Sequence, residues 1–258
     1  PGIHSDISFI PFSFTLSAFA QNMQLFYTPG INPAHPQYFL NEEESKHAIR
    51  VMRLEKGEEV QLIDGKGGLY SASILDAHPK RTILQINSVT AEFNKRNHYL
   101  HIAIAPTKNI ERTEWFLEKA TEIGIDEISL IICQRSERKE AKVERLNKII
   151  TSAIKQSIKA YHPVLNEPLT FNQLLAKPFS GQKFIAHCDA GEKISLKDEL
   201  KMHGNYLILI GPEGDFAPAE IADTLKNDFK AITLGESRLR TETAALEACF
   251  EVNFLNRG

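Results

Sequence analysis

The sequence predicts an α/β protein in which a small β-barrel precedes a parallel α/β domain. Two observations carry this prediction. Short β-branched or alternating runs crowd the stretch from Met23 to about residue 89, as in small β folds. After about residue 98, buried-type apolar runs alternate with helical segments, which is the pattern of a parallel sheet covered on both faces. We expect a boundary near residues 92–98 and domains of residues 23–95 and 96–258.

Residues 1–22 stand apart from both domains. They contain no Lys or Arg and precede Met23, the first methionine of the chain. Their Ser-Ala-Phe-Ala tail resembles a signal-peptidase site, but the basic region of a signal peptide is missing. We therefore expect residues 1–22 to be translated upstream sequence or a cloning remnant outside the fold, in preference to a secretory signal.

The first domain is expected to contain five strands and one helix. The strands are predicted over residues 25–28, 38–40, 58–64, 68–77 and 81–89. The helix is predicted over 41–53, because Asn41 can cap it, acids follow in its first turn, and Arg50 and Arg53 come at its end. The glycines of residues 64–68 predict a hairpin turn rather than a phosphate loop, since no helix follows them.

The second domain is expected to alternate strands and helices. Strands are predicted over 100–106, 127–133, 183–189, 206–211 and 231–235. Helices are predicted over 111–124, 141–159, 217–228 and 241–256, the first ended by Gly124 and the last capped by Thr241.

Composition excludes some classes of protein. Apolar residues make up 42% and charged residues 24% of the chain, as in soluble globular proteins, and no apolar run approaches the roughly 20 residues of a membrane span. The net charge of −3 argues against a generic nucleic-acid coat, but allows a site-specific enzyme with a local basic patch. Three scattered cysteines without a CxxC pair indicate reduced thiols and a cytoplasmic protein. His101, His162 and His187 lack the spacing of metal ligands, so we expect no metal site.

Two loops that follow predicted strands carry the strongest functional signal. GPEGDF follows the strand 206–211, and LGESRLRTETAALEA follows the strand 231–235. Ligands of open α/β sheets bind beyond the carboxyl ends of strands, and we expect these two strand ends to be adjacent. Glycine lets backbone approach a ligand, although an ordinary turn would explain either loop alone. Neither loop is a GxGxxG or Walker sequence, but Arg238 and Arg240 stand directly before a helix N-terminus.

These loops, with the upstream EWFLEKATEIGIDEI and KQSIKAYHP, resemble the ribosomal RNA small subunit methyltransferase E family of the SPOUT class. The resemblance runs in order from Met23 to the C-terminus. It implies a PUA-like RNA-binding barrel followed by an α/β domain threaded as a trefoil knot. It also implies a homodimer that binds S-adenosylmethionine and methylates N3 of one uridine in 16S rRNA of the small ribosomal subunit.

The resemblance also assigns a cofactor site between the two loops. One wall would be Gly211, Pro212, Glu213 and Gly214, and the other Leu234, Gly235, Glu236, Ser237 and Leu239. A flat purine suits an apolar slot with a few fixed polar groups.

The implied reaction selects two catalytic candidates. Because N3 of neutral uridine carries a proton, the enzyme must favour the deprotonated ring, whose negative charge spreads onto O2 and O4. The guanidinium of Arg240 is the candidate stabiliser of that charge. Glu242 is the candidate base, directly or through water, although a carboxylate at a helix start is also typical of capping.

Basic residues are the candidate RNA contacts, and a solvated, salt-bridged surface is the alternative for each of them. The candidates are Arg50 and Arg53 on the barrel, and Lys108, Arg112, Arg138, Lys139 and Lys142 in the second domain. Lys159 departs from the family pattern, which has an arginine at that position, so its role stays open.

Three interpretations therefore remain. The first is the rRNA methyltransferase, the second a non-catalytic RNA-binding or ribosome-assembly factor, and the third a knotted methyltransferase with another RNA target. The intact pair of loops and Arg240 favour catalysis. The final helix is apolar around more than one face, which predicts a homodimer interface that includes Leu246, Phe250 and Phe254.

Overall fold

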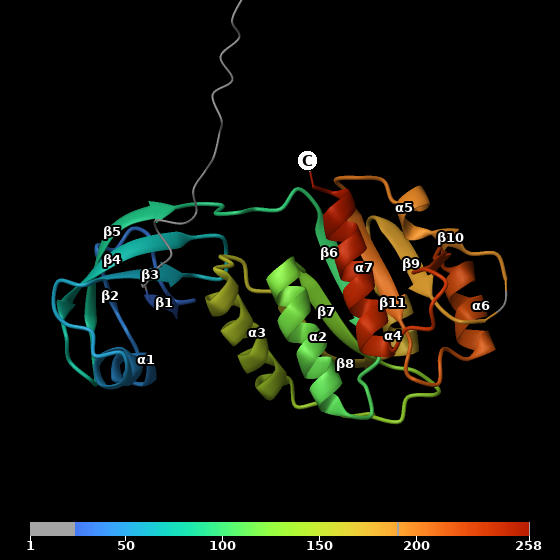
Figure 1. Cartoon of the computed structure of the whole chain (residues 1–258), viewed down its shortest axis with the longest axis horizontal. Helices are drawn as coiled ribbons and strands as arrows, with labels where there is room; N and C mark the ends of the chain where they lie inside the picture. Colours follow the sequence, from blue (N-terminus) through green and yellow to red (C-terminus); the bar gives the residue numbers. More distant parts are fainter. Residues whose placement is uncertain (1–23, 190, 258) are drawn as a thin grey trace, which may run out of the picture.

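The structure is a computed structural model that describes residues 24–189 and 191–257 (Figure 1). The predicted leader, residues 1–22, lies outside the described residues. Two sheets organise the chain, one of five strands and one of seven.

The five-stranded sheet forms the N-terminal domain and has the order β1-β3-β4-β5-β2. Its strands are β1 (Gln24–Tyr27), β2 (Gln37–Phe39), β3 (Glu59–Ile63), β4 (Leu69–Asp76) and β5 (Ile83–Thr90). The strands enclose a core that includes Phe26, Leu62 and Leu84, all fully buried. The five strands predicted from the sequence are therefore all present.

The helix predicted over residues 41–53 is shorter and irregular. Asn41 caps α1 (Glu42–Lys46) by accepting a hydrogen bond from the amide of Glu44 at 2.8 Å. A π-helical turn, η1 (His47–Val51), then replaces the α-helical ladder. Arg53 lies beyond this turn with a φ of 59°, so it is not helical as predicted.

The seven-stranded sheet is parallel and has the order β10-β12-β9-β11-β6-β7-β8. Its strands are β6 (Tyr99–Ile104), β7 (Glu127–Ile132), β8 (Val164–Thr170), β9 (Gln182–Ala186), β10 (Ile194–Ser195), β11 (Asn205–Ile210) and β12 (Lys230–Thr233). The sequence prediction missed β8 and β10. β8 is a half-exposed edge strand that contains a proline, and β10 has only two residues, so neither has a buried-strand pattern.

Helices cover both faces of this sheet because side chains alternate along its strands. Ile102 and Ile104 of β6 pack with α2 (Ile110–Ile123), α3 (Val143–Ser157), α5 (Leu196–Glu199) and α7 (Thr241–Leu255). Ala103 packs on the opposite face with α4 (Phe171–Leu175) and α6 (Pro218–Lys226). Figure 1 shows α2, α3 and α7 side by side on the first face.

The ends of two predicted helices differ from the structure. The residue that caps α7 is Arg240, whose backbone is extended, and Thr241 is the first helical residue rather than the cap. α3 ends at Ser157 rather than at Lys159, because Ile158 takes a left-handed conformation with a φ of 52°.

The predicted hairpin turn at residues 64–68 is present and packs against the second domain. The Asp64 carboxylate accepts hydrogen bonds from the amides of Lys66 and Gly68 at 2.7 and 2.9 Å. Gly67, with a φ of 106°, lies against the ring of Tyr161, where an added Cβ would come within 2.5 Å of ring atoms. Only glycine therefore lets the turn pack this closely against the second domain.

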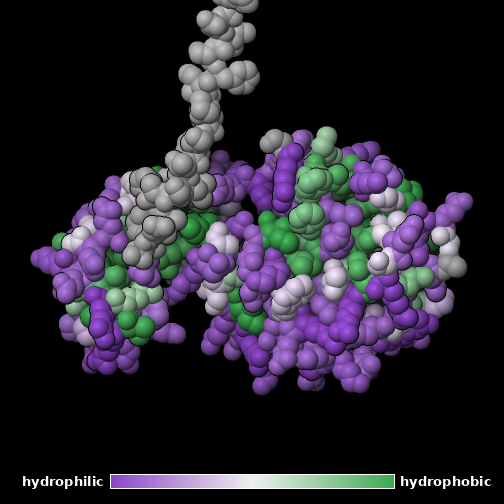
Figure 2. Space-filling view, in the orientation of Figure 1, coloured by the Kyte–Doolittle hydropathy of each residue, from purple (hydrophilic) through white to green (hydrophobic). Residues whose placement is uncertain are grey.

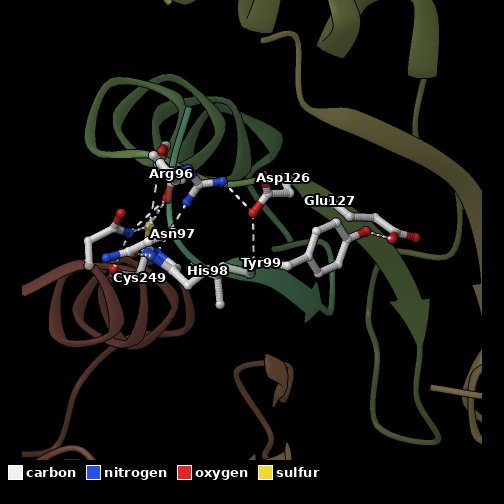
Figure 3. Close-up of polar contacts among 11 residues, drawn as sticks. Arg96, Asn97, His98, Tyr99, Asp126, Glu127 and Cys249 are labelled. Atoms are coloured by element: carbon white, nitrogen blue, oxygen red, sulfur yellow. Dashed lines mark hydrogen bonds and ion pairs between the residues drawn. The ribbon is translucent and has the colours of Figure 1, made fainter. Parts of the chain in front are cut away.

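The linker between the domains is held by polar contacts (Figure 3). Arg96 forms an ion pair with Asp126, and the side-chain amide of Asn97 donates to the backbone carbonyl of Asn256 at 3.0 Å. Elsewhere at the joint, Lys155 of α3 lies 3.2 Å from Glu44 of α1. The barrel therefore contacts the second domain at several points.

Candidate functional site

The carboxyl edge of the seven-stranded sheet gathers most of the predicted site residues. Because the strands are parallel, the segments that follow β6, β7, β9, β11 and β12 all emerge at this edge. The predicted walls 211–214 and 234–239 lie here, as do Lys108 after β6 and Arg138 after β7. Arg50 and Arg53 belong to the other domain and are not brought to this edge (Figure 1).

The two loops do not follow adjacent strands, contrary to the prediction. β9 lies between β11 and β12, with Leu209 paired to Ile185 on one side and Ala231 paired to Ile185 on the other. The loops therefore flank the end of β9, where His187 and Cys188 follow the last strand residue. Strand order in a parallel sheet depends on the crossover connections, which the local sequence pattern does not specify.

His187 is a site candidate that the sequence analysis passed over. Its Nδ1 atom is buried and has no hydrogen-bond partner among the described residues. Burial, and then the charge of Lys193, lower the pKa of His187, which favours a neutral imidazole. The available signal was the ending of the strand 183–189 in His-Cys-Asp, next to the site but without metal-ligand spacing.

The loop after β11 is held by its neighbours. Asp215, at a φ of 63°, donates its amide to the carbonyl of Pro212 at 2.9 Å, and its carboxylate accepts from the amide of Cys188 at 2.8 Å. Glu213 accepts from the amide of Lys108 at 2.9 Å. These bonds tie the ends of β6, β9 and β11 together, so the predicted first wall is a preformed turn.

The two glycines of this loop, Gly211 and Gly214, differ in the space that surrounding atoms leave for a side chain. A Cβ on Gly211 would lie 3.0 Å from the Phe216 ring, a tight contact that would require the buried ring to shift. A Cβ on Gly214 would lie 3.4 Å from the Cβ of Arg135, which is ordinary contact. Internal packing therefore leaves room for a Cβ at Gly214 and much less room for one at Gly211.

The loop after β12 is more open. Gly235 has a φ of 107° and its carbonyl accepts a hydrogen bond from the Thr233 hydroxyl at 2.9 Å. A Cβ on Gly235 would meet no atom within 4 Å. Leu234 and Leu239 are half-buried, while Glu236 and Ser237 between them are exposed. This loop offers apolar side chains and free backbone groups to the edge.

The catalytic candidates lie at the start of α7. Arg240 is exposed, whereas Glu242 is buried, with 9% of its side chain accessible. Oε1 of Glu242 lies 3.7 Å from Nε of Arg112, and Oε2 is buried without a hydrogen-bond partner in the described part of the chain. A capping carboxylate would use its oxygens on helix amides, so this free oxygen argues against the capping interpretation.

Several predicted RNA contacts are engaged within the chain. Arg138 donates to the carbonyls of Thr107 and Lys108 at 3.0 and 2.8 Å, and the ammonium of Lys108 lies 2.8 Å from Glu137. Arg138 therefore supports the loop after β6 and has fewer donors left for a phosphate. Lys139 and Lys142 remain exposed.

Comparison with known proteins identifies the chain's relatives. Residues 94–252 match a family profile described as an RNA methyltransferase domain, and residues 40–87 match one described as an RNA methyltransferase PUA domain. The chain belongs to this RNA methyltransferase family. The α/β class with a PUA-like domain before it is thereby confirmed, and the threading of the chain as a knot stays a prediction.

Similar proteins carry the name that the sequence resemblance suggested. The chain is 28% identical over 213 residues to ribosomal RNA small subunit methyltransferase E of Synechocystis, covering 80% of this chain and 69% of that protein. It is 25% identical over 235 residues to the Bacillus subtilis protein of the same name, covering 85% of this chain and 90% of that protein.

Solved structures agree with the fold over nearly the whole chain. A probable rRNA methyltransferase from Porphyromonas gingivalis is 38% identical, with a TM-score of 0.84 over 91% of this chain and 98% of that one. A ribosomal RNA small subunit methyltransferase E from Neisseria gonorrhoeae, bound to S-adenosyl methionine, is 25% identical, with a TM-score of 0.81 over the same shares.

Proposed function

We propose that this RNA methyltransferase transfers a methyl group from S-adenosylmethionine to N3 of a uridine in 16S rRNA of the small ribosomal subunit. One observation carries the proposal. In a chain of this family, two glycine loops flank the end of β9 at the carboxyl edge, with a buried carboxylate and an exposed guanidinium beside them. Relatives named for small-subunit rRNA methylation support the substrate.

The residues at this edge fit the cofactor. Leu234 and Leu239 supply half-buried apolar surface for a purine, and no other described residue comes within 4 Å of the position that a Cβ on Gly235 would take. The preformed turn 211–214 supplies the other wall. When bound, S-adenosylmethionine supplies a methyl group already activated by the positive sulfonium. The neighbour from Neisseria gonorrhoeae is bound to the same compound.

The chain's own residues then supply positioning, charge and proton transfer. Glu242 accepts the N3 proton of the uracil, directly or through a water, on its unpartnered oxygen Oε2. Nε of Arg112 lies 3.7 Å from the other oxygen, Oε1, so its guanidinium positions the carboxylate from one side. Arg240 holds the negative charge that spreads onto O2 and O4 of the ring.

A homodimer is part of the proposal. On α7, Phe250 and Phe254 are 42% and 55% exposed, and their rings stack with centroids 5.9 Å apart. Figure 2 shows apolar surface along this helix. The guanidinium of Arg257 lies over both rings. Exposed aromatic side chains that stack on one helix are typical of an interface with a second copy of the chain. We expect this interface to include Leu246 of the same helix.

We place this activity in the cytoplasm, where the three thiols of Cys133, Cys188 and Cys249 stay reduced. In the part of the chain that the structure describes, no helix has the length and apolar character to cross a bilayer. The same part contains no group of three or more His, Cys, Asp or Glu side chains placed to hold a metal ion.

Nucleoside analysis tests the proposed function. Purified protein is incubated with S-adenosylmethionine and unmodified 16S rRNA or small subunits, and the digested rRNA is analysed by mass spectrometry. We expect N3-methyluridine to form. Methylation of a ribose or of another base would identify a different target, and no methylation of either substrate would favour the non-catalytic assembly factor.

A further inference from the structure

A pocket of about 230 Å³ lies where the two domains meet, away from the carboxyl edge of the sheet. Its walls come from the linker at residues 93–98, from the turn at 124–126 between α2 and β7, and from residues 159–161 after α3. The methyl transfer proposed above uses none of these residues. Pockets for whole small molecules are usually larger, so this volume suits a compact group.

Lys159 contributes an unbalanced positive charge to this pocket. Its side chain is half-buried, and burial, followed by the neighbouring Arg96 guanidinium, lowers the pKa of Lys159. Its ammonium forms no ion pair within the described ranges 24–189 and 191–257. A partly desolvated ammonium without a counter-charge is unfavourable, so the free protein holds Lys159 at a cost in stability.

The acidic groups near Lys159 are already engaged. The Asp126 carboxylate pairs with Arg96 and also accepts the amide of Leu100 at 2.7 Å (Figure 3). On the linker, Glu92 pairs with Lys95. No further carboxylate lines the pocket among the described residues.

The remaining titratable neighbours add no negative charge. Burial raises the pKa of Cys249 to about 12, so this side chain is a neutral thiol at pH 7. Burial, with the charge of Arg96, lowers the pKa of His98 to about 4, so its imidazole is neutral too. With Lys95 paired to Glu92 and Arg96 paired to Asp126, the charge of Lys159 is the one left unbalanced among the described residues that line the cavity.

We propose that this pocket is a binding site for a phosphate group, held by the ammonium of Lys159 and the guanidinium of Arg96. A phosphate supplies the missing negative charge and accepts hydrogen bonds from both side chains. The small volume and the surplus of positive charge together favour this ligand over an uncharged one.

The phosphate has two possible sources, the backbone of the substrate RNA or free phosphate. The RNA source rests on the function proposed above. The pocket borders Tyr99, the first residue of β6, whereas the candidate site follows Ile104, its last. Six strand residues span about 20 Å, so a nucleotide held here would position the RNA and would not touch the reacting base.

Thermal unfolding tests the pocket without RNA or methylation. The variants are Lys159→Met, Lys159→Arg and, as a matched control, Lys226→Met, which removes an exposed lysine of α6. We expect inorganic phosphate, compared with chloride at equal ionic strength, to raise the unfolding midpoint of the wild type, Lys159→Arg and Lys226→Met but not of Lys159→Met. Without phosphate, Lys159→Met is expected to be at least as stable as the wild type, because it removes an unpaired half-buried charge.

Salt-titrated binding of a 16S rRNA fragment then separates the two sources. If the pocket holds an RNA phosphate, Lys159→Met weakens RNA binding several-fold and reduces the salt slope by about 0.7–0.9, as for one phosphate contact, while Lys226→Met does neither. If phosphate raises the unfolding midpoint of the wild type but not of Lys159→Met, and Lys159→Met binds the RNA as the wild type does, the site is assigned to free phosphate. If Lys159→Met matches Lys226→Met in both assays, the pocket is no phosphate site. Failure of the wild type to methylate 16S rRNA would refute the proposed function and leave the unfolding assay valid.

Discussion

Arg112 and Glu242, 130 positions apart in sequence, meet at the carboxyl edge of the sheet, with Nε of Arg112 3.7 Å from Oε1 of Glu242. Glu242 is buried and its second oxygen has no partner in the described part of the chain. A carboxylate with one oxygen beside a cation and one oxygen without a partner suits proton transfer, because it is held in place and keeps an accepting site.

Glu242→Gln should therefore slow methylation. The amide keeps the volume but cannot take the N3 proton, so we expect the single-turnover rate to fall by roughly 10²–10⁴-fold, the usual range for a general base. The measurement is a single-turnover assay with saturating cofactor and rRNA. Glu167→Gln, at an exposed position on the edge strand β8 away from the candidate site, is the control. A Glu242→Gln enzyme of wild-type rate would reduce Glu242 to a structural role.

Arg240→Ala should lower the rate with a smaller effect on RNA affinity. If Arg240 stabilises charge on the uracil ring, its contribution arises mainly in the transition state, and the expected loss is roughly 10²–10³-fold in single-turnover rate. A variant with both exposed residues Lys139 and Lys142 replaced by Gln provides the comparison for RNA affinity. It should weaken RNA binding and flatten the salt dependence of that binding. Arg138 is left intact, since it supports the loop at Lys108. Lost affinity at an unchanged rate would make Arg240 a phosphate contact.

Gly214→Val should weaken cofactor binding without unfolding the protein. A Cβ at Gly214 lies at ordinary contact distance from Arg135, so the turn has room for a Cβ, and a ligand next to the turn would meet the added methyl groups. We expect the wild type to bind S-adenosylhomocysteine with a micromolar or lower dissociation constant, about −8 kcal/mol, and the variant to bind far more weakly. Calorimetry measures both. Gly211→Ala, whose Cβ would lie 3.0 Å from the buried Phe216 ring and require that ring to shift, is expected to lower the free energy of unfolding more than Gly214→Val does. Undiminished binding by Gly214→Val would remove this turn from the site.

Phe254→Glu should dissociate the proposed homodimer. Phe254 is 55% exposed and stacks on Phe250, so a charge there would be buried without a partner in a dimer but would face water in a monomer. Light scattering at micromolar concentration is expected to report a dimer for the wild type and a monomer for the variant. Val164→Glu, at an exposed position on the edge strand β8, is the control. A wild type that is monomeric at this concentration would refute the dimer.

Acid should destabilise the protein through His101, which is 5% exposed on β6. Burial lowers the pKa of His101 to about 4, although Glu127 opposes this, and Lys177 is the other charge that faces the ring. Because the unfolded chain protonates near pH 6.5, it binds the proton first as the pH falls, so stability declines between about pH 6.5 and 4. Over the whole of that range the contribution is roughly 3 kcal/mol. Urea unfolding at pH 7.5 and 5 measures it, and His101→Gln should show a smaller decline. An equal decline in both proteins would assign the effect to other groups.

The sequence alone determined the local elements and the chemistry they carry. Alternating and buried apolar runs located β1 to β7, β9, β11 and β12, because side-chain burial repeats along a strand with a fixed period. Glycines and charged residues after β11 and β12 identified the loops of the candidate site. The motifs of these two loops also indicated the family by themselves. Local patterns missed β8 and β10, whose exposed or very short strands carry no such period.

Only the tertiary structure decided which of these pieces meet. The insertion of β9 between β11 and β12 brought His187 to the site, and the same folding placed Arg112 against Glu242 and left Lys159 facing Arg96 without a counter-charge. It also engaged Arg138, a predicted RNA contact, with the backbone carbonyls of Thr107 and Lys108. The physical reason is that strand order and side-chain contacts across the chain depend on crossover paths and close packing between distant segments, whereas sequence periodicity reports only the burial of each segment by itself.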